Sequence, residues 1–155
     1  MNRKMIVYSL GRMLILEAFL FLLPIITGFI YKENSVAFCF LIVAVFTAFV
    51  GYVCSYKKPK KMKIYAKEGF VIVALAWTVL SLFGALPFYI SGEIPSYVDA
   101  FFETVSGFTT TGSSILNNVE ALSHASLIWR SFAHWVGGMG VLVFVVAILP
   151  EEDRK

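Results

Sequence analysis

Five consecutive small residues, Thr109, Thr110, Thr111, Gly112 and Ser113, offer the chemistry that this sequence indicates most directly. Backbone carbonyls and threonine hydroxyls are the ligands that replace the water shell of a dehydrated cation in a selectivity filter. Gly112 can adopt a backbone conformation that would strain other residues. A Thr-Thr-Gly string alone is a common turn, so its interpretation depends on the elements around it.

A short helix is predicted directly before this segment. Ser96 is a good N-cap, and Asp99 completes a Ser-x-x-Asp pattern that resembles a capping box. We expect the helix to span residues 97–106, with Gly107 as a left-handed C-cap. Ten residues extend about 15 Å, half of the apolar core of a membrane. The C-terminal carbonyls would then point at residues 108–114, where the helix dipole favours a cation.

The composition is that of an integral membrane protein. Of the 155 residues, 59% are hydrophobic and 15% are charged. A helix needs about 20 apolar residues to cross the membrane core. Four segments of roughly that length lie at residues 5–30, 36–55, 68–90 and 126–150.

We therefore expect an all-α membrane protein made of two units. Residues 1–56 form a two-helix transmembrane hairpin, and residues 57–67 form a basic connector. Residues 68–155 form one repeat of helix, re-entrant pore loop and helix, with the pore loop between its two spans. A segment of non-helical backbone inside a membrane has to line a water-filled or ion-filled path.

Charged residues set the expected topology. Six of the thirteen basic residues lie in the connector, and others precede the first span and follow the last. Residues 91–125 contain no Lys or Arg. By the positive-inside rule, the connector and both termini face the cytoplasm, and the pore loop enters from outside. The connector is also expected to attract anionic lipids of the bilayer.

Ionisable residues near the loop and inside the spans need partners, because charge is costly in the membrane. Glu103 in the short helix and Arg130 near the outer end of the last span are expected to pair as a structural clamp behind the filter. Asp99 could attract cations to the outer mouth, although N-capping already explains it. Glu17 is interpreted as a carboxylate that serves helix packing.

The other polar side chains have simpler interpretations. Glu93 and Glu120 are expected to be solvated in the outer loop. His124 and His134 point in different directions on a helix, and no Cys or matched carboxylate lies near them in the sequence, so a two-histidine metal site is not expected. Basic residues do not alternate with aromatic ones, which argues against a nucleic-acid partner.

Several residues are expected to shape the helices. Pro24 should kink the first span. Gly137, Gly138 and Gly140 should allow close helix approach in the last one. Trp129, with the other two tryptophans, is expected in part to mark the membrane interfaces.

Five motifs point to a known family: EGF at 68–70, GALPF at 84–88, DAFFETVSGFTTTG at 99–112, WRSF at 129–132 and WVGGMG at 135–140. Together they resemble the N-terminal part of Trk/Ktr-type potassium uptake subunits, and the resemblance covers essentially the whole chain. In that family four tandem repeats surround a filter with one central glycine per repeat. Gly112 occupies that position.

The resemblance implies potassium as the transported ion, bound through Thr110, Thr111 and Gly112, with no covalent cofactor and no catalysis. It also implies a homodimer of full-length subunits, a cytosolic nucleotide-binding regulatory subunit of the RCK type, and the plasma membrane of a bacterium or archaeon. Only one repeat is present. We expect a fragment that is inactive alone, completed by the remaining repeats of the same subunit or by further copies. The alternative is a non-conducting membrane scaffold or assembly module.

Overall fold

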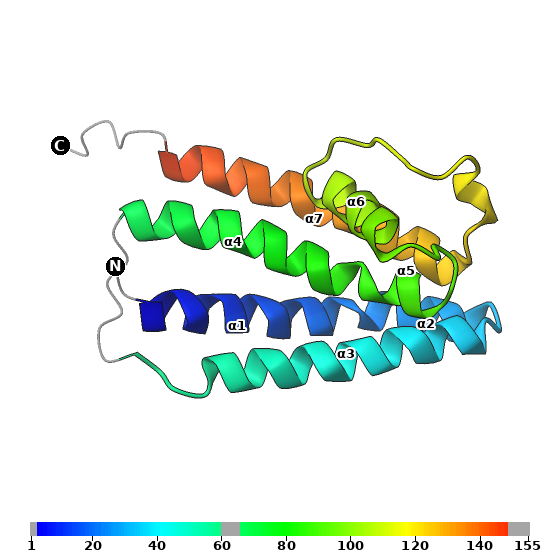
Figure 1. The fold of residues 1–155 in the computed structure, drawn as a ribbon, viewed down its shortest axis with the longest axis horizontal. Coiled ribbons are helices and arrows are strands. Elements are labelled where there is room, and N and C mark those ends of the chain that lie inside the picture. The colour runs from blue at the N-terminus through cyan, green and yellow to red at the C-terminus, as the bar shows by residue number, and fades with distance from the viewer. Residues whose placement is uncertain (1–2, 60–65, 149–155) are drawn as a thin grey trace.

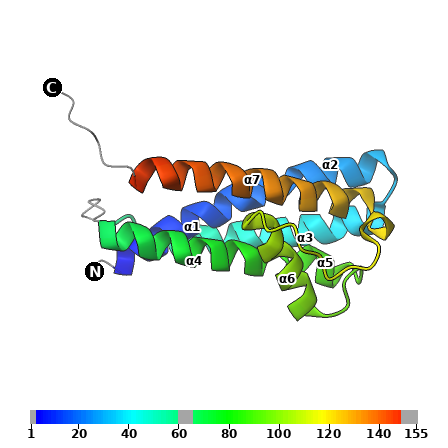
Figure 2. The same ribbon diagram turned by 90° about the horizontal axis from the view of Figure 1, so that it is seen from above.

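The computed structural model describes residues 3–59 and 66–148, and every regular element in these ranges is helical. The elements are α1 (Arg3–Leu20), α2 (Leu22–Ile30), α3 (Asn34–Ser55), α4 (Ala66–Gly84), α5 (Leu86–Ile90), α6 (Tyr97–Phe108), a short 3-10 helix (Val119–Ala121) and α7 (His124–Ile148). In Figures 1 and 2, α1, α3, α4 and α7 run along the long axis, and α2, α5 and α6 gather toward one end. The expected all-helical class is confirmed.

Three helical segments of the described chain are long and apolar enough to cross a membrane: Arg3–Ile30, Asn34–Ser55 and Lys67–Ile90. They correspond to the first three expected spans. Helix α7 has 25 residues, a length of about 37 Å at the helical rise. Its crossing of the membrane stays a prediction.

Basic side chains gather at one end of the bundle. Arg3 and Lys4 at the start of α1 line a shared groove with Lys57 and Lys58, which follow α3. Basic residues concentrate on the cytoplasmic side of a membrane, and the side that this end faces stays a prediction. The other part of the basic connector, residues 60–65, lies outside the described residues.

Two of the spans are interrupted two or three residues before a proline. The first is broken at Phe21, between α1 and α2, and the third is broken at Ala85, between α4 and α5. Pro24 and Pro87 have no N–H group for the carbonyl four residues earlier, which weakens the helix at these positions. The expected kink near Pro24 is therefore present, and Pro87 produces a second break that was not expected.

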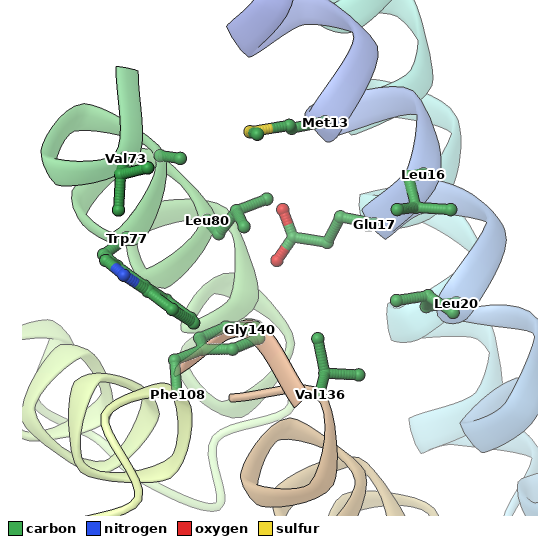
Figure 3. Close-up of a pocket in the computed structure, with 11 residues that line it drawn as sticks. Met13, Leu16, Glu17, Leu20, Val73, Trp77, Leu80, Phe108, Val136 and Gly140 are labelled. Carbon is green, nitrogen blue, oxygen red and sulfur yellow. The ribbon is translucent and has the colours of Figure 1, made fainter. Parts of the chain in front are cut away.

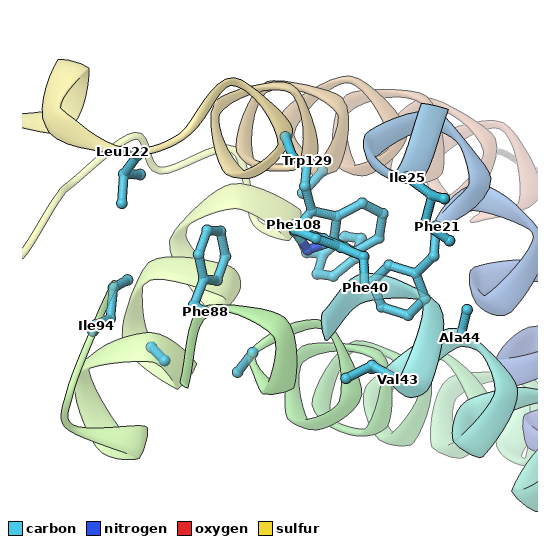
Figure 4. Close-up of a cluster of buried hydrophobic side chains, with 14 residues drawn as sticks. Phe21, Ile25, Phe40, Val43, Ala44, Phe88, Ile94, Phe108, Leu122 and Trp129 are labelled. Carbon is cyan, nitrogen blue, oxygen red and sulfur yellow. The ribbon is translucent and has the colours of Figure 1, made fainter. Parts of the chain in front are cut away.

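The buried core lies where the hairpin meets the second unit (Figure 4). Trp129 of α7 is at its centre and is only 1% exposed. The ring of Phe21 lies 4.4 Å from the Trp129 ring between centroids, and Phe108 packs against Trp129 edge-on at 6.2 Å. The indole Nε1 donates to the carbonyl of Gly84 at 3.1 Å. The expectation of an interfacial Trp129 is wrong, because its N–H finds this partner inside the protein.

Helices α1 and α3 approach closely where two glycines face each other. A Cβ atom on Gly51 would lie 2.8 Å from the carbonyl oxygen of Gly11, and one on Gly11 would lie 2.8 Å from that of Gly51. Helix pairs in membranes commonly use small residues in this way, since the backbones can then make close van der Waals contact.

The N-terminus of α7 is capped by a carboxylate from the hairpin. Glu33, in the turn between α2 and α3, accepts hydrogen bonds from the backbone N–H groups of His124 at 3.0 Å and Ala125 at 3.2 Å. The His124 ring lies 2.8 Å from the same carboxylate and stacks on Tyr31. Burial by itself would raise the pKa of Glu33, but these hydrogen bonds outweigh it and lower that pKa.

A second carboxylate completes this cap. Glu93 accepts a hydrogen bond from the backbone N–H of Ser123 at 2.6 Å and another from the Ser126 hydroxyl. The expectation that Glu93 is solvated is therefore wrong. Helix α7 has no acidic residue in its own first turn, so its N-terminal dipole is compensated from elsewhere in the chain.

We predict opposite effects for the same substitution at two helical glycines. Gly51→Ala should lower the free energy of unfolding by about 1–3 kcal/mol, because the new methyl group would overlap α1. Gly69→Ala in α4 should raise it by about 0.5–1 kcal/mol, because a Cβ there meets nothing within 4 Å. Unfolding in detergent, followed by circular dichroism, measures both. Equal shifts would contradict the close α1 and α3 contact.

We predict that Glu33→Gln lowers stability at neutral pH by about 1 kcal/mol, because the cap of α7 loses its charge. Since the pKa of Glu33 is lowered in the folded protein, its stabilisation is present above the ordinary glutamate pKa of about 4.3 and is lost as pH falls through the lower folded value. Unfolding at a series of pH values should show the two proteins converging below about pH 4. Glu120→Gln, at an exposed carboxylate of the short 3-10 helix, is the control.

Candidate functional site

Helix α6 begins as its sequence predicts. The Ser96 side chain accepts a hydrogen bond from the backbone N–H of Asp99 at 3.4 Å, so Ser96 is the N-cap. Asp99 lies in the first turn, where its charge suits the helix dipole. It is at the opposite end of α6 from Thr109, and the structure does not bring it together with the expected filter residues.

The C-terminal end of α6 differs from the expected one. The helix continues through Gly107 to Phe108, and the residue with left-handed backbone is Thr110, at a φ of 57°. The N–H of Thr110 donates to the carbonyl of Gly107 at 3.0 Å, and the N–H of Thr111 donates to that of Ser106, also at 3.0 Å. This pair of bonds is a Schellman motif, so the expectation that Gly107 is the left-handed cap is wrong.

Gly107 instead provides space for α7. A Cβ atom on Gly107 would lie 3.3 Å from the Cβ of Ala133. Farther along α7, a Cβ on Gly137 would lie 2.1 Å from the carbonyl oxygen of Phe108, so the end of α6 rests directly on that glycine. The expected packing role of the α7 glycines is present at Gly137, whereas Gly138 has no close neighbour of this kind.

The segment after α6, residues 109–113, is exposed throughout. The Thr109 hydroxyl donates to the carbonyl of Val105 at 2.7 Å. The Thr111 hydroxyl lies 2.9 Å from the Thr109 hydroxyl. Gly112 has a φ of 76°, a conformation that suits glycine. The five residues singled out in the sequence thus lie together in an exposed segment that follows the C-terminal end of a helix, where cations are favoured.

This segment is tied back to α6 by Glu103 and Ser106. Glu103 is fully buried at its side chain and accepts hydrogen bonds from the Ser114 hydroxyl at 3.0 Å and from the N–H of Ile115 at 3.2 Å. The Ser106 hydroxyl donates to the carbonyl of Ser113 at 2.5 Å. The sequence analysis included Ser114 in the segment of residues 108–114 but did not predict these contacts of Ser106 and Ser114, because serines show no periodic pattern that reveals them.

Arg130 of α7 completes the arrangement. Its Nε lies 2.5 Å from a carboxylate oxygen of Glu103, and the Arg130 side chain is 18% exposed. The predicted pairing of these two residues is therefore observed. The ion pair neutralises the Glu103 charge and links α6 to α7.

Comparison with known proteins gives a consistent picture. Residues 36–155 match the family described as TrkH, cation transport protein. The chain is 39% identical over 145 residues to an uncharacterized cation transporter of Methanocaldococcus jannaschii, covering 93% of this chain and 30% of that protein. It is 38% identical over 152 residues to the Trk system potassium uptake protein TrkH of Escherichia coli K12, covering 97% and 31%.

A solved structure agrees with the fold. The crystal structure of the potassium transporter TrkH from Vibrio parahaemolyticus matches this chain with a TM-score of 0.89 at 36% identity, covering 97% of this chain and 32% of that one. The chain thus spans 30–32% of the length of these three relatives.

We predict that Arg130→Met destabilises the protein by about 3 kcal/mol or more, because it leaves the buried Glu103 charge without its ion-pair partner. Adding Glu103→Gln should recover part of this loss, since the amide is uncharged and its oxygen can still accept from Ser114. Arg12→Met, the same change at an exposed side chain of α1, should cause no comparable loss. Thermal unfolding of the four proteins in detergent measures this. A double variant no more stable than Arg130→Met would contradict the explanation by charge.

Proposed function

The chain belongs to the TrkH family of cation transport proteins, since the family match covers residues 36–155, and from this premise we propose that it takes part in potassium uptake across the plasma membrane. It contributes one of four filter segments. Potassium is bound on one side by the carbonyls of Thr110, Thr111 and Gly112, with Thr109 and Ser113 continuing the same surface.

The observation that supports this proposal is the end of α6. A short helix of 12 residues points its C-terminal carbonyls toward an exposed polar segment that is bonded back to the helix at Ser106 and Glu103. Such a segment holds carbonyl ligands in position before an ion arrives, which lowers the cost of exchanging the water shell for protein oxygens. Glu103 and Arg130 support it from behind. The role of Asp99 is to cap α6.

One segment covers one side of a potassium ion, so this chain alone does not conduct. Because it spans 30–32% of its relatives, the other three sides come from further repeats of the same subunit or from further copies. We propose that residues 1–56 are a hairpin beside the repeat of residues 68–155. The expected end of the last span, near residue 150, lies outside the described residues.

The basic groove at the ends of α1 and α3 suggests the orientation. We propose that this end, with both termini of the chain, faces the cytoplasm and that α6 enters from outside. Full-length subunits pair as homodimers, and a nucleotide-binding regulatory subunit of the RCK type docks on the basic face. The membrane is that of a bacterium or archaeon, and no reaction is catalysed.

Two matched glycine substitutions test the filter. The chain replaces the matched segment of TrkH from Vibrio parahaemolyticus, and potassium-limited growth and potassium uptake are measured in cells. Gly112→Ser should abolish most uptake, because it disturbs the carbonyls that face the ion. Gly92→Ser is the control: Gly92 also has positive φ, at 77°, with nothing within 4 Å of its Cβ position, but it lies in the turn after α5.

Equal losses for the two serine variants would show backbone strain rather than a filter role. Full uptake by Gly112→Ser, at equal membrane abundance, would favour the alternative of a non-conducting scaffold or assembly module.

A further inference from the structure

Glu17 of α1 is a buried carboxylate that its surroundings leave without a hydrogen-bond partner. The residue is 2% exposed, and neither carboxylate oxygen has a partner among the described residues. Arg12, the nearest basic residue before it in α1, is exposed. Buried polar groups are costly unless they are hydrogen-bonded, so this site calls for a donor that the described chain does not provide.

The Glu17 carboxylate points into a cavity of about 390 Å³ between α1, α4 and α7 (Figure 3). Apart from Glu17 and the indole N–H of Trp77, the side chains that line the cavity are apolar, with Leu16 and Leu80 among them. Two aromatic side chains, Trp77 and Phe108, form part of the wall. The cavity falls within the usual size of small-molecule sites, about 300–1,000 Å³, and has their usual character of an apolar lining with few polar groups.

Gly84 helps to form this site. A Cβ atom on Gly84 would lie 3.0 Å from Oε1 of Glu17 and 2.9 Å from a methyl carbon of Thr104. The carboxylate therefore lies against the end of α4 and close to α6, and the glycine leaves room for it.

We propose that this cavity is a binding site for a small amine with an apolar body, whose nitrogen pairs with the Glu17 carboxylate. The nitrogen supplies the missing hydrogen-bond donors, and the apolar body fills the rest of the cavity. An ammonium group near Trp77 also gains attraction from the indole ring. The proposal does not depend on potassium transport.

Other occupants match this lining less well. A bare metal cation needs several oxygen ligands, and only the carboxylate of Glu17 is present. An ordered water needs two to four polar partners. A purely apolar ligand would leave Glu17 unsatisfied.

The pairing adds no net charge to the membrane. An amine that enters from the lipid in its neutral form accepts the proton of a neutral Glu17 carboxyl group. One O–H bond breaks and one N–H bond forms, giving an ammonium and a carboxylate that remain in contact. Charged hydrogen bonds of this kind are stronger than neutral ones.

The test compares phenylbutylamine with phenylbutanol, which has a similar shape and no amine. Binding to the full chain in lipid nanodiscs is measured by calorimetry, with empty nanodiscs subtracted. The amine should bind roughly tenfold or more tightly than the alcohol. Glu17→Gln should reduce amine binding to the level of the alcohol, and Glu120→Gln, at an exposed position of the short 3-10 helix, should leave it unchanged. Equal binding of amine and alcohol, or full amine binding by Glu17→Gln, would overturn the proposal.

A second measurement does not depend on the folding of a variant. A phenylalkylamine that carries a diazirine is photo-crosslinked to the unmodified chain in nanodiscs, and the labelled peptides are identified by mass spectrometry. The site is supported by labels on peptides of α1 and α4 that contain Met13, Leu16 or Val73. Excess phenylbutylamine should prevent this labelling, and excess phenylbutanol should not. Labels confined to other helices, or equal competition by both compounds, refute the site.

Discussion

The buried Glu103 carboxylate is the interaction on which the loop after α6 depends. Backbone that leaves a helix inside a membrane protein must find partners for its polar groups. Glu103 provides them by accepting from Ser114 and Ile115, and Arg130 balances its charge. Because one carboxylate serves the loop and α7 together, the position of the loop is fixed relative to both helices. The Ser113 carbonyl is held by the Ser106 hydroxyl, and the segment before it, residues 109–112, is exposed.

Close backbone packing supports the same arrangement. Gly137 allows α7 to rest on the last carbonyl of α6, and Trp129 places its indole against Phe108 while bonding to Gly84. Phe21 of the hairpin packs on that indole. The hairpin is thus part of the core that positions the loop.

Local signals in the sequence predicted much of this structure. The start of α6 followed from Ser96, because an N-cap depends on residues a few positions apart. The pairing of Glu103 with Arg130 followed from two charges at similar depth in apolar segments. The end of α6 was missed, since the Schellman motif places a threonine in the left-handed conformation that normally favours glycine. Glu93 and Trp129 were also misplaced, because their partners lie about 30 and 45 residues away and no local pattern indicates such contacts. The ion-binding role of residues 109–113 stays a prediction.

The double cap of α7 has a consequence for the order of synthesis. Glu33 and Glu93 both precede the helix that they cap. A ribosome therefore completes both carboxylates before it makes His124, so the acceptors that cap α7 exist before α7 does. Unsatisfied N–H groups at a helix start are costly. The order of the elements along the chain shortens the time for which α7 has to exist without its cap.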